Sequence, residues 1–167
     1  MNKTLSTFLL AVAPMLVFAG GNHGGHDMGS MTSHIAGMHQ EEHNSDAGRA
    51  GDPSKVSRTI EMTMDDSMRF TPSQISVKTG ETIRFFVKNA GKVPHEMVIG
   101  TASELKEHAE MMRQMPGMKH ADSNTITLAP GKRGGIVWQF DKTGLVEFAC
   151  LIPGHTEAGM KGTISVK

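Results

Sequence analysis

The residues most able to do chemistry lie close together near the C-terminus, in the stretch "ACLIPGHTEAGM" (149–160). Cys150 is the only cysteine of the 167-residue chain; His155 follows it by five positions, and Met160 follows His155 by five. One cysteine cannot form an internal disulfide, so it is a free thiol, an intermolecular bridge or a metal ligand. A thiolate, an imidazole, a more distant second histidine and a weak axial thioether together make the trigonal His₂Cys site that binds electron-transfer copper.

The second histidine of such a site must come from an earlier loop, and His95 is the best candidate. It follows the turn "AGKVP" and begins the apolar segment "HEMVIG", and Pro94 restricts the backbone that leads to it. His108 lies within a predicted helix and His120 lies beyond that helix, so each is a less rigid candidate. We therefore expect His95 to join Cys150, His155 and Met160 in one metal site.

Two other interpretations of these residues remain open. Cys150 can be a buried core thiol and Met160 a filler of irregular core space, which is the commonest use of methionine. A zinc site can also use the same two histidines and cysteine, because geometry and metal supply decide the metal more than affinity does.

Eight short segments rich in β-branched and aromatic residues follow residue 56, and turns with glycine or proline separate them. This pattern predicts an all-β domain over residues 56–167, a Greek-key antiparallel β-sandwich. The expected strands are "SRTIEMTM" (57–64), "SQISVK" (73–78), "TIRFFVKN" (82–89), "HEMVIG" (95–100), "NTITLAP" (124–130), "GIVWQF" (135–140), "LVEFAC" (145–150) and "KGTISVK" (161–167). We expect Met62, Met64 and Met68 to serve mainly in strand packing.

One segment breaks the series of strands and predicts an inserted helix at about 102–116. Thr101 or Ser103 can cap its start, and Pro116 ends it. A stripe at i, i+3, i+7 and i+10 has the spacing of a core-facing helix side, and it can equally bind metal: Leu105, His108, Met112 and Met115. Met111 and Met118 lie at the margin of this stripe or beyond it, so they are further candidate copper ligands.

The N-terminus "MNKTLSTFLLAVAPMLVFA" (1–19) predicts a cleaved secretory signal peptide, with Lys3 before a short apolar run and small residues at its end. The alternative is a retained N-terminal anchor, which Pro14 disfavours by interrupting the run. No other apolar stretch approaches the ~20 residues of a membrane span. We therefore expect an exported, periplasmic protein without stable membrane insertion.

Residues 20–55 hold few large aliphatic side chains, so the sequence predicts a disordered tail there. Eight side chains of the tail offer copper an imidazole or a thioether: His23, His26, Met28, Met31, His34, Met38, His39 and His43. The alternative is a solvated linker whose histidines are incidental. Without the signal peptide the chain has 16 basic and 17 acidic residues and no basic run, which argues against nucleic acid as a partner.

Several motifs together resemble the cupredoxins, the type 1 copper proteins related to plastocyanin and azurin. "CLIPGHTEAGM" and the upstream "PHEMVI" carry this resemblance over about residues 57–167. "MRFTP", "GETIRFFVKNAGK" and the Met-rich helix extend it to the exported copper-resistance cupredoxins. The resemblance implies a cupredoxin fold and one type 1 copper centre formed by His95, Cys150, His155 and Met160. Azurin-type and plastocyanin-type proteins generally lack the helix and the tail.

Two functions compete on this basis. The first is copper tolerance, in which the protein binds copper and cycles it between oxidation states, with further copper held weakly by the tail. The second is electron transfer to a periplasmic reductase or oxidase that docks near His155, on an apolar rim of Leu151, Ile152, Pro153 and Ala158. A multicopper enzyme is disfavoured, because those enzymes have a histidine beside the type 1 cysteine and this chain has Ala149 and Leu151 there. The tail favours copper tolerance, since an electron carrier has no need of extra ligands.

Overall fold

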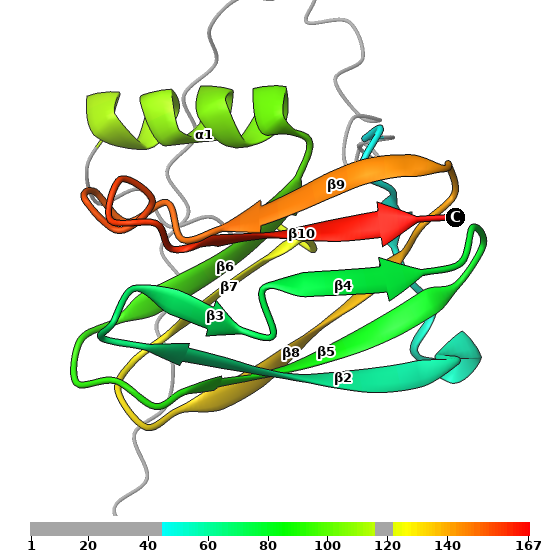
Figure 1. Ribbon diagram of the computed structural model, residues 1–167, viewed down its shortest axis with the longest axis horizontal. Helices are drawn as coiled ribbons and strands as arrows, with labels where there is room; N and C mark the ends of the chain where they lie inside the picture. The colour runs from blue at the N-terminus through cyan, green and yellow to red at the C-terminus, as the bar shows by residue number, and fades with distance from the viewer. Residues whose placement is uncertain (1–44, 116–121) are drawn as a thin grey trace, which may run out of the picture. The chain divides into compact units, whose positions relative to one another are not determined.

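The computed structural model describes residues 45–115 and 122–167, where ten strands form two five-stranded sheets of a β-sandwich (Figure 1). The first sheet has the order β1 (Arg49–Ala50), β8 (Arg133–Gln139), β5 (Thr82–Asn89), β2 (Arg58–Asp65) and β3 (Arg69–Thr71). The second has the order β4 (Gln74–Val77), β10 (Lys161–Val166), β9 (Gly144–Ala149), β6 (His95–Gly100) and β7 (Thr125–Leu128). All eight expected strands are present, with ends that differ by at most two residues from the expected ones, and the predicted sandwich is confirmed.

The core lies between the two sheets and follows from the two-residue period of a strand. Along β5 the side chains of Ile83, Phe85 and Val87 are buried, while those between them are exposed. Phe70 of β3 and Phe148 of β9 meet edge to face across the core, with ring centroids 5.0 Å apart. Met62 and Met64 are buried in the same core, as expected, while Met68 lies in the turn between β2 and β3 and packs against the core half-buried.

Strand β6 differs because all six of its residues are buried. Its inner face belongs to the main core, while Val98 on its outer face packs with Leu105 of the helix α1 (Ala102–Gln114). A strand covered on both sides loses the alternation that marks a half-exposed strand.

Helix α1 begins as the sequence predicts. The Thr101 hydroxyl accepts a hydrogen bond from the backbone N–H of Glu104, and the Glu104 carboxylate accepts one from the backbone N–H of Thr101. This capping box satisfies two backbone donors that would otherwise lack partners. The helix lies against β6 and β9 of the second sheet (Figure 1). In the part of the chain that the structure describes, no helix is both long and apolar enough to span a membrane.

Two strand pairs are parallel, β2 with β5 and β4 with β10, whereas the sequence led us to expect antiparallel pairing throughout. Both arise because the short strands β3 and β4 follow each other closely yet belong to different sheets. The chain therefore crosses from one sheet to the other at residues 72–73.

The folded region also begins earlier than residue 56, which corrects the C-terminal limit of the predicted tail. Ala47 is buried, and its carbonyl accepts a hydrogen bond of 2.8 Å from the indole N–H of Trp138. Strand β1 then pairs with the edge of β8. A buried indole N–H needs an acceptor, and this segment supplies it. Residues 20–44, with all eight candidate tail ligands, lie outside the described residues.

Candidate metal centre

Cys150, His155 and Met160 lie on one loop that joins two neighbouring strands. Strand β9 ends at Ala149, β10 begins at Lys161, and these two residues are partners in the antiparallel register. Inside the loop the N–H of Cys150 donates to the carbonyl of Met160 at 3.0 Å, and the N–H of Met160 donates to the carbonyl of His155 at 3.0 Å. The eleven-residue loop 150–160 is therefore closed by its own backbone, and Met160 is fully buried.

The turn within this loop depends on glycine. Gly154 has φ of 89° and Gly159 has φ of 98°, a conformation that side chains with a Cβ rarely adopt. The N–H of His155 donates to the carbonyl of Ile152 at 3.0 Å across Pro153 and Gly154, which closes a tight turn there. At the far side of the loop, the guanidinium of Arg69 donates to the carbonyl of Ala158 at 2.8 Å, which ties the loop to β3.

His95 lies at the same end of the sandwich, after a loop whose conformation depends on Asn89, a residue that the sequence did not single out. The side chain of Asn89, fully buried, donates to the carbonyls of Val93 and Leu128 at 2.8 and 2.9 Å and accepts from the N–H of Gly91 at 2.8 Å. The side-chain NH₂ of this buried amide thus donates two hydrogen bonds, and its oxygen accepts one. Asn89 therefore holds the turn that delivers His95 to the start of β6.

The structure brings His95, Cys150 and His155 together, with one potential ligand atom of each within 4.8 Å of the others. The thiol sulfur lies 3.2 Å from Nδ1 of His155, and the two imidazole rings have centroids 5.0 Å apart. His95 is fully buried, and among the described residues its Nδ1 has no hydrogen-bond partner. An unpaired buried polar atom lowers the stability of the fold by about 1–3 kcal/mol, so it calls for an explanation. A metal ion bound between His95, Cys150 and His155 would give this nitrogen a partner.

The chemical state of the two loop ligands suits a metal. Burial raises the pKa of the Cys150 thiol to about 11, so the metal-free protein holds a neutral thiol, and a bound metal must displace its proton. The N–H of Glu96 points at the sulfur from 3.3 Å and favours the thiolate. Burial, and after it the neighbouring His95, lowers the pKa of His155, so this imidazole is neutral and able to ligate at pH 7.

Asp66, in the turn after β2, was also missed by the sequence analysis. Its carboxylate lies 3.2 Å from Nε2 of His95, while Nδ1 of the same ring is the buried nitrogen without a partner. The backbone N–H of Lys92 is the main cause that holds the pKa of the Asp66 carboxyl below its ordinary value. The carboxylate is thus ionised where it meets the His95 ring.

The donor set fits one type 1 copper centre: two histidines and one cysteine converge, with the axial candidate Met160 buried at the end of the same loop. Cys150 is buried, as the core-thiol interpretation also requires, but that interpretation gives no reason for two imidazoles beside the sulfur. His108 lies on α1 and takes no part in the cluster, while Met118 and His120 lie outside the described residues.

The predicted stripe on α1 leaves the core after its first member. Leu105 is buried, and Ala109 packs beside it against Val98 and Leu151. His108 and Met112 are only half-buried, and Met115 has 41 % of its surface exposed. With Met111, also half-buried, these residues have the i, i+3, i+4, i+7 spacing of one helix side. We call His108, Met111, Met112 and Met115 the α1 flank.

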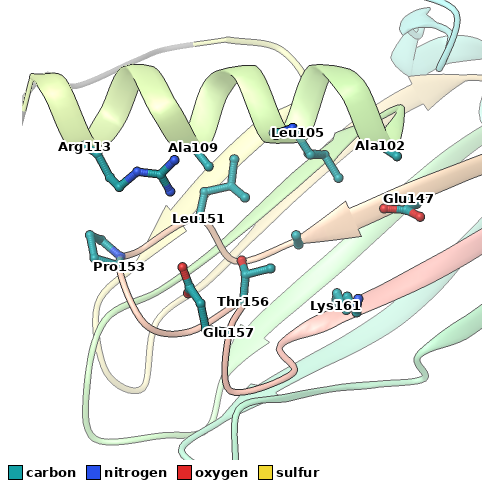
Figure 2. A pocket seen from close by; sticks show the side chains of 12 residues that line it. Ala102, Leu105, Ala109, Arg113, Glu147, Leu151, Pro153, Thr156, Glu157 and Lys161 are labelled. Carbon is teal, nitrogen blue, oxygen red and sulfur yellow. The ribbon is translucent and has the colours of Figure 1, made fainter.

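A groove of about 310 Å³ separates the other side of α1 from the loop that carries His155 (Figure 2). Ala109 and Arg113 line it from the helix, and Pro153 and Glu157 line it from the loop. Leu151 lies between the two and is buried, so the helix covers part of the apolar rim expected around His155. Pro153 and Ala158 remain exposed.

Comparison with known proteins gives a consistent result. Residues 56–167 match the model of the family described as copper binding proteins, plastocyanin/azurin family. The chain is 48 % identical over 166 residues to the copper-resistant cuproprotein CopI of Rubrivivax gelatinosus, covering 99 % of both chains. It is 36 % identical over 166 residues to a protein of the same name from Vibrio cholerae, covering 98 % of both. Among solved structures, reduced auracyanin of Roseiflexus castenholzii superposes with a TM-score of 0.57 at 25 % identity, over 67 % of this chain and 98 % of that one.

Proposed function

Because the chain belongs to the plastocyanin/azurin family of copper-binding proteins, we propose that it protects the cell against copper by binding it at His95, Cys150, His155 and Met160. The observation that carries the proposal is the buried, unpaired Nδ1 of His95 beside the Cys150 sulfur and the His155 ring. Copper in such a site exchanges one electron between Cu(I) and Cu(II). The relatives named copper-resistant cuproproteins, similar over the whole chain, support the link to tolerance.

The protein contributes a fixed set of donors to this chemistry. Backbone hydrogen bonds close the loop around Cys150 and Met160, and Asn89 fixes the approach to His95. Donors held in this way give both oxidation states nearly the same surroundings, which keeps structural rearrangement small when an electron moves. Redox cycling of captured copper therefore needs no large motion of the chain.

Electron transfer to a partner protein is the second candidate function. The exposed Pro153 and Ala158 beside the half-buried His155 favour it, since an apolar rim suits docking. Helix α1 weakens this candidate, because Leu151 is buried against it and the rim is correspondingly smaller.

A copper titration of growth separates the two functions. A strain that lacks the protein should be sensitive to added copper and grow normally without it, and the Cys150→Ser variant should not restore full tolerance. Normal growth of the deletion strain at every copper level, with a respiratory defect at ordinary copper, would instead establish the electron carrier.

Further copper ligands on the tail and on α1 form the second part of the proposal. The tail candidates are His23, His26, Met28, Met31, His34, Met38, His39 and His43. On the helix the candidate is Met111, which belongs to the α1 flank, where the thioethers and the imidazole are half-buried or exposed. The last candidate is Met118, four residues after the end of the helix at Gln114. Soft, uncharged donors of this kind favour Cu(I), and the C-terminal end of a helix favours a cation.

Ag(I), a redox-inert substitute for Cu(I), tests these ligands in the full chain labelled with ¹³C-methyl methionine. The methyl signals of Met112 and Met115 should shift on Ag(I) addition, while those of the core residues Met62 and Met64 should not. Replacing Met111, Met112 and Met115 together by leucine, which keeps size and helix propensity, should remove one Ag(I) equivalent. Unmoved helix signals beside shifted tail signals would limit the extra binding to the tail.

Export through a signal peptide at residues 1–19 completes the proposal. Mass spectrometry of the protein recovered from the periplasm should give a mature chain that starts at Gly20. A full-length chain retained in the membrane fraction would establish the N-terminal anchor instead.

A further inference from the structure

Asp66 contacts the buried candidate ligand His95 at Nε2, while the other ring nitrogen of His95, Nδ1, has no partner among the described residues. Its Oδ1 lies 3.2 Å from Nε2 of His95. Its Oδ2 accepts the N–H of Lys92 at 2.7 Å, and Oδ1 also faces the N–H of Val93 at 3.4 Å. The carboxylate is therefore held by the backbone of the loop before His95 while it meets the ring.

An ionised carboxylate can only accept hydrogen bonds, and a neutral imidazole carries a proton on one nitrogen. Beside Asp66 that proton must sit on Nε2, which leaves the lone pair on Nδ1, the buried atom without a partner. We propose that Asp66 is a positioning residue that holds His95 in the tautomer able to bind copper and, through its negative charge, favours Cu(II) over Cu(I). The part that concerns the His95 tautomer does not depend on the proposed function, whereas the part that concerns Cu(II) and Cu(I) rests on the proposed copper site.

The charge acts through the ring. A carboxylate that accepts the outer N–H of a ligating histidine raises the electron-donating strength of the inner nitrogen. A stronger donor stabilises the more highly charged Cu(II), so the centre holds a lower reduction potential than it would with a neutral partner at this position.

The contacts also explain why an asparagine would not serve. An amide has one acceptor oxygen, and Asp66 must accept on both sides, from Lys92 and from His95. In Asp66→Asn the oxygen should keep the shorter bond to Lys92, which turns the amide NH₂ towards Nε2 of His95. That donor favours the tautomer with the proton on Nδ1, where it blocks the metal.

Because Gly91 has no side chain, Asp66 and His95 have room to meet beside it. A Cβ at this position would lie 2.0 Å from Oδ1 of Asp66 and 3.0 Å from Nε2 of His95. Gly91→Ala thus offers a way to push the carboxylate off the ring without changing its charge.

The first test uses the metal-free full chain with ¹⁵N-labelled histidine, so that NMR gives the tautomer of His95 at pH 7. The wild type should carry the proton on Nε2. Asp66→Ala and Gly91→Ala should give a mixture, and Asp66→Asn should shift the population towards Nδ1–H. Asp65→Asn is the matched control, because the neighbouring Asp65 bonds to Ser67 and not to His95.

The second test measures Cu(I) and Cu(II) affinities by competition. Both neutral variants of Asp66 should lower the Cu(II)-to-Cu(I) affinity ratio about tenfold, which raises the potential by ~59 mV. Asp66→Asn should bind Cu(II) more weakly than Asp66→Ala. If Asp66 only anchored the loop through Lys92, Asp66→Ala would be the more damaging change and the tautomer would not move, which would overturn the proposal.

The two tests fail separately. A wild type that binds no copper would end the proposed function and leave the tautomer result standing. An unchanged tautomer in all three variants, with copper bound normally, would end the role of Asp66 and leave the proposed function intact.

Discussion

The end of the sandwich that carries the loop 150–160, here called the loop end, and the α1 flank offer similar donor atoms. They differ in how far these atoms are buried and how firmly they are held. At the loop end, His95, Cys150 and Met160 are fully buried, and backbone hydrogen bonds fix the chain on either side of them. On the α1 flank the imidazole and thioethers are half-buried or exposed, and they follow one side of the helix. Burial and fixed geometry suit a metal that stays and exchanges electrons, whereas exposed donors suit a metal that arrives and leaves.

The largest effect should come from Cys150→Ser, which removes the thiolate from the buried centre. Cu(II) added to the wild type should give an intense visible sulfur-to-copper absorption, and the variant should show none, because a serine oxygen is not a comparable donor. Ag(I) should still shift the methionine signals of the α1 flank. A coloured variant would show that the sulfur is not a ligand, and lost Ag(I) binding would show that the two regions are coupled.

Met160→Leu should have a smaller effect on the same centre. Axial thioethers bind weakly, so the variant should keep its colour and copper while losing a donor that helps stabilise Cu(II). We expect its reduction potential to rise by at least ~59 mV, a tenfold change in the Cu(II)-to-Cu(I) ratio, measured by redox titration. A variant that no longer holds copper would make Met160 essential for the site.

Thr101→Ala tests the helix side of the comparison. It removes the hydroxyl that accepts the N–H of Glu104 at the start of α1, and the loss of such a cap costs about 1 kcal/mol. Urea unfolding should show this loss, while the visible spectrum of the copper-loaded protein stays unchanged. A shifted spectrum would mean that α1 supports the geometry of the centre. Ser103→Ala is the control, because it removes the 3.0 Å contact between the Ser103 and Thr101 hydroxyls and leaves both bonds of the capping box in place.

The smallest effect belongs to Glu81, at the end of the sandwich away from both regions. The Arg58 guanidinium beside Glu81 lowers the pKa of its carboxyl, so the pair stabilises the fold above the unfolded-state pKa, and this contribution disappears as pH falls through the lowered folded value. Because Arg58 is partly exposed, we expect the pair to contribute at most about 1 kcal/mol. The difference in unfolding free energy between wild type and Glu81→Gln should shrink from pH 7 to pH 3, with copper and Ag(I) binding unchanged at pH 7. A constant difference would exclude the ion pair as its cause.

The sequence predicts most of the fold, because the patterns involved are local. Strands β5 and β6 match the expected segments residue for residue, and the capping signal of α1 gives its start. Strands β1 and β3 have two and three residues, too few to show a period. The alternation of a strand also says which side is buried and not which strand lies beside it, so the two parallel pairs could not be predicted.

In the candidate site, too, the residues that are close in sequence could be predicted, and those that only the fold brings together could not. Cys150, His155 and Met160 lie within eleven residues, and their spacing was enough to make them candidate ligands. Asp66 lies 29 residues from His95, and Asn89 lies 39 from Leu128, so their roles follow from contacts that no local pattern records. On α1 the spacing of Leu105 and Met112 predicted a shared buried face, but only Leu105 is buried, in a small cluster with Val98 and Leu151, while Met112 is half-buried.

The closed backbone of the loop 150–160 has an implication for protein engineering. Among the described residues, two hydrogen bonds reach the loop from outside, one from the guanidinium of Arg69 to the carbonyl of Ala158 and one from the N–H of Glu96 to the Cys150 sulfur. The loop's backbone hydrogen bonds otherwise stay within residues 150–161, and its ends are a single antiparallel residue pair, Ala149 and Lys161. Such a pair occurs wherever two neighbouring antiparallel strands finish together. The loop is therefore a self-contained unit that can be grafted onto another sandwich, where one suitably placed histidine would complete a copper site.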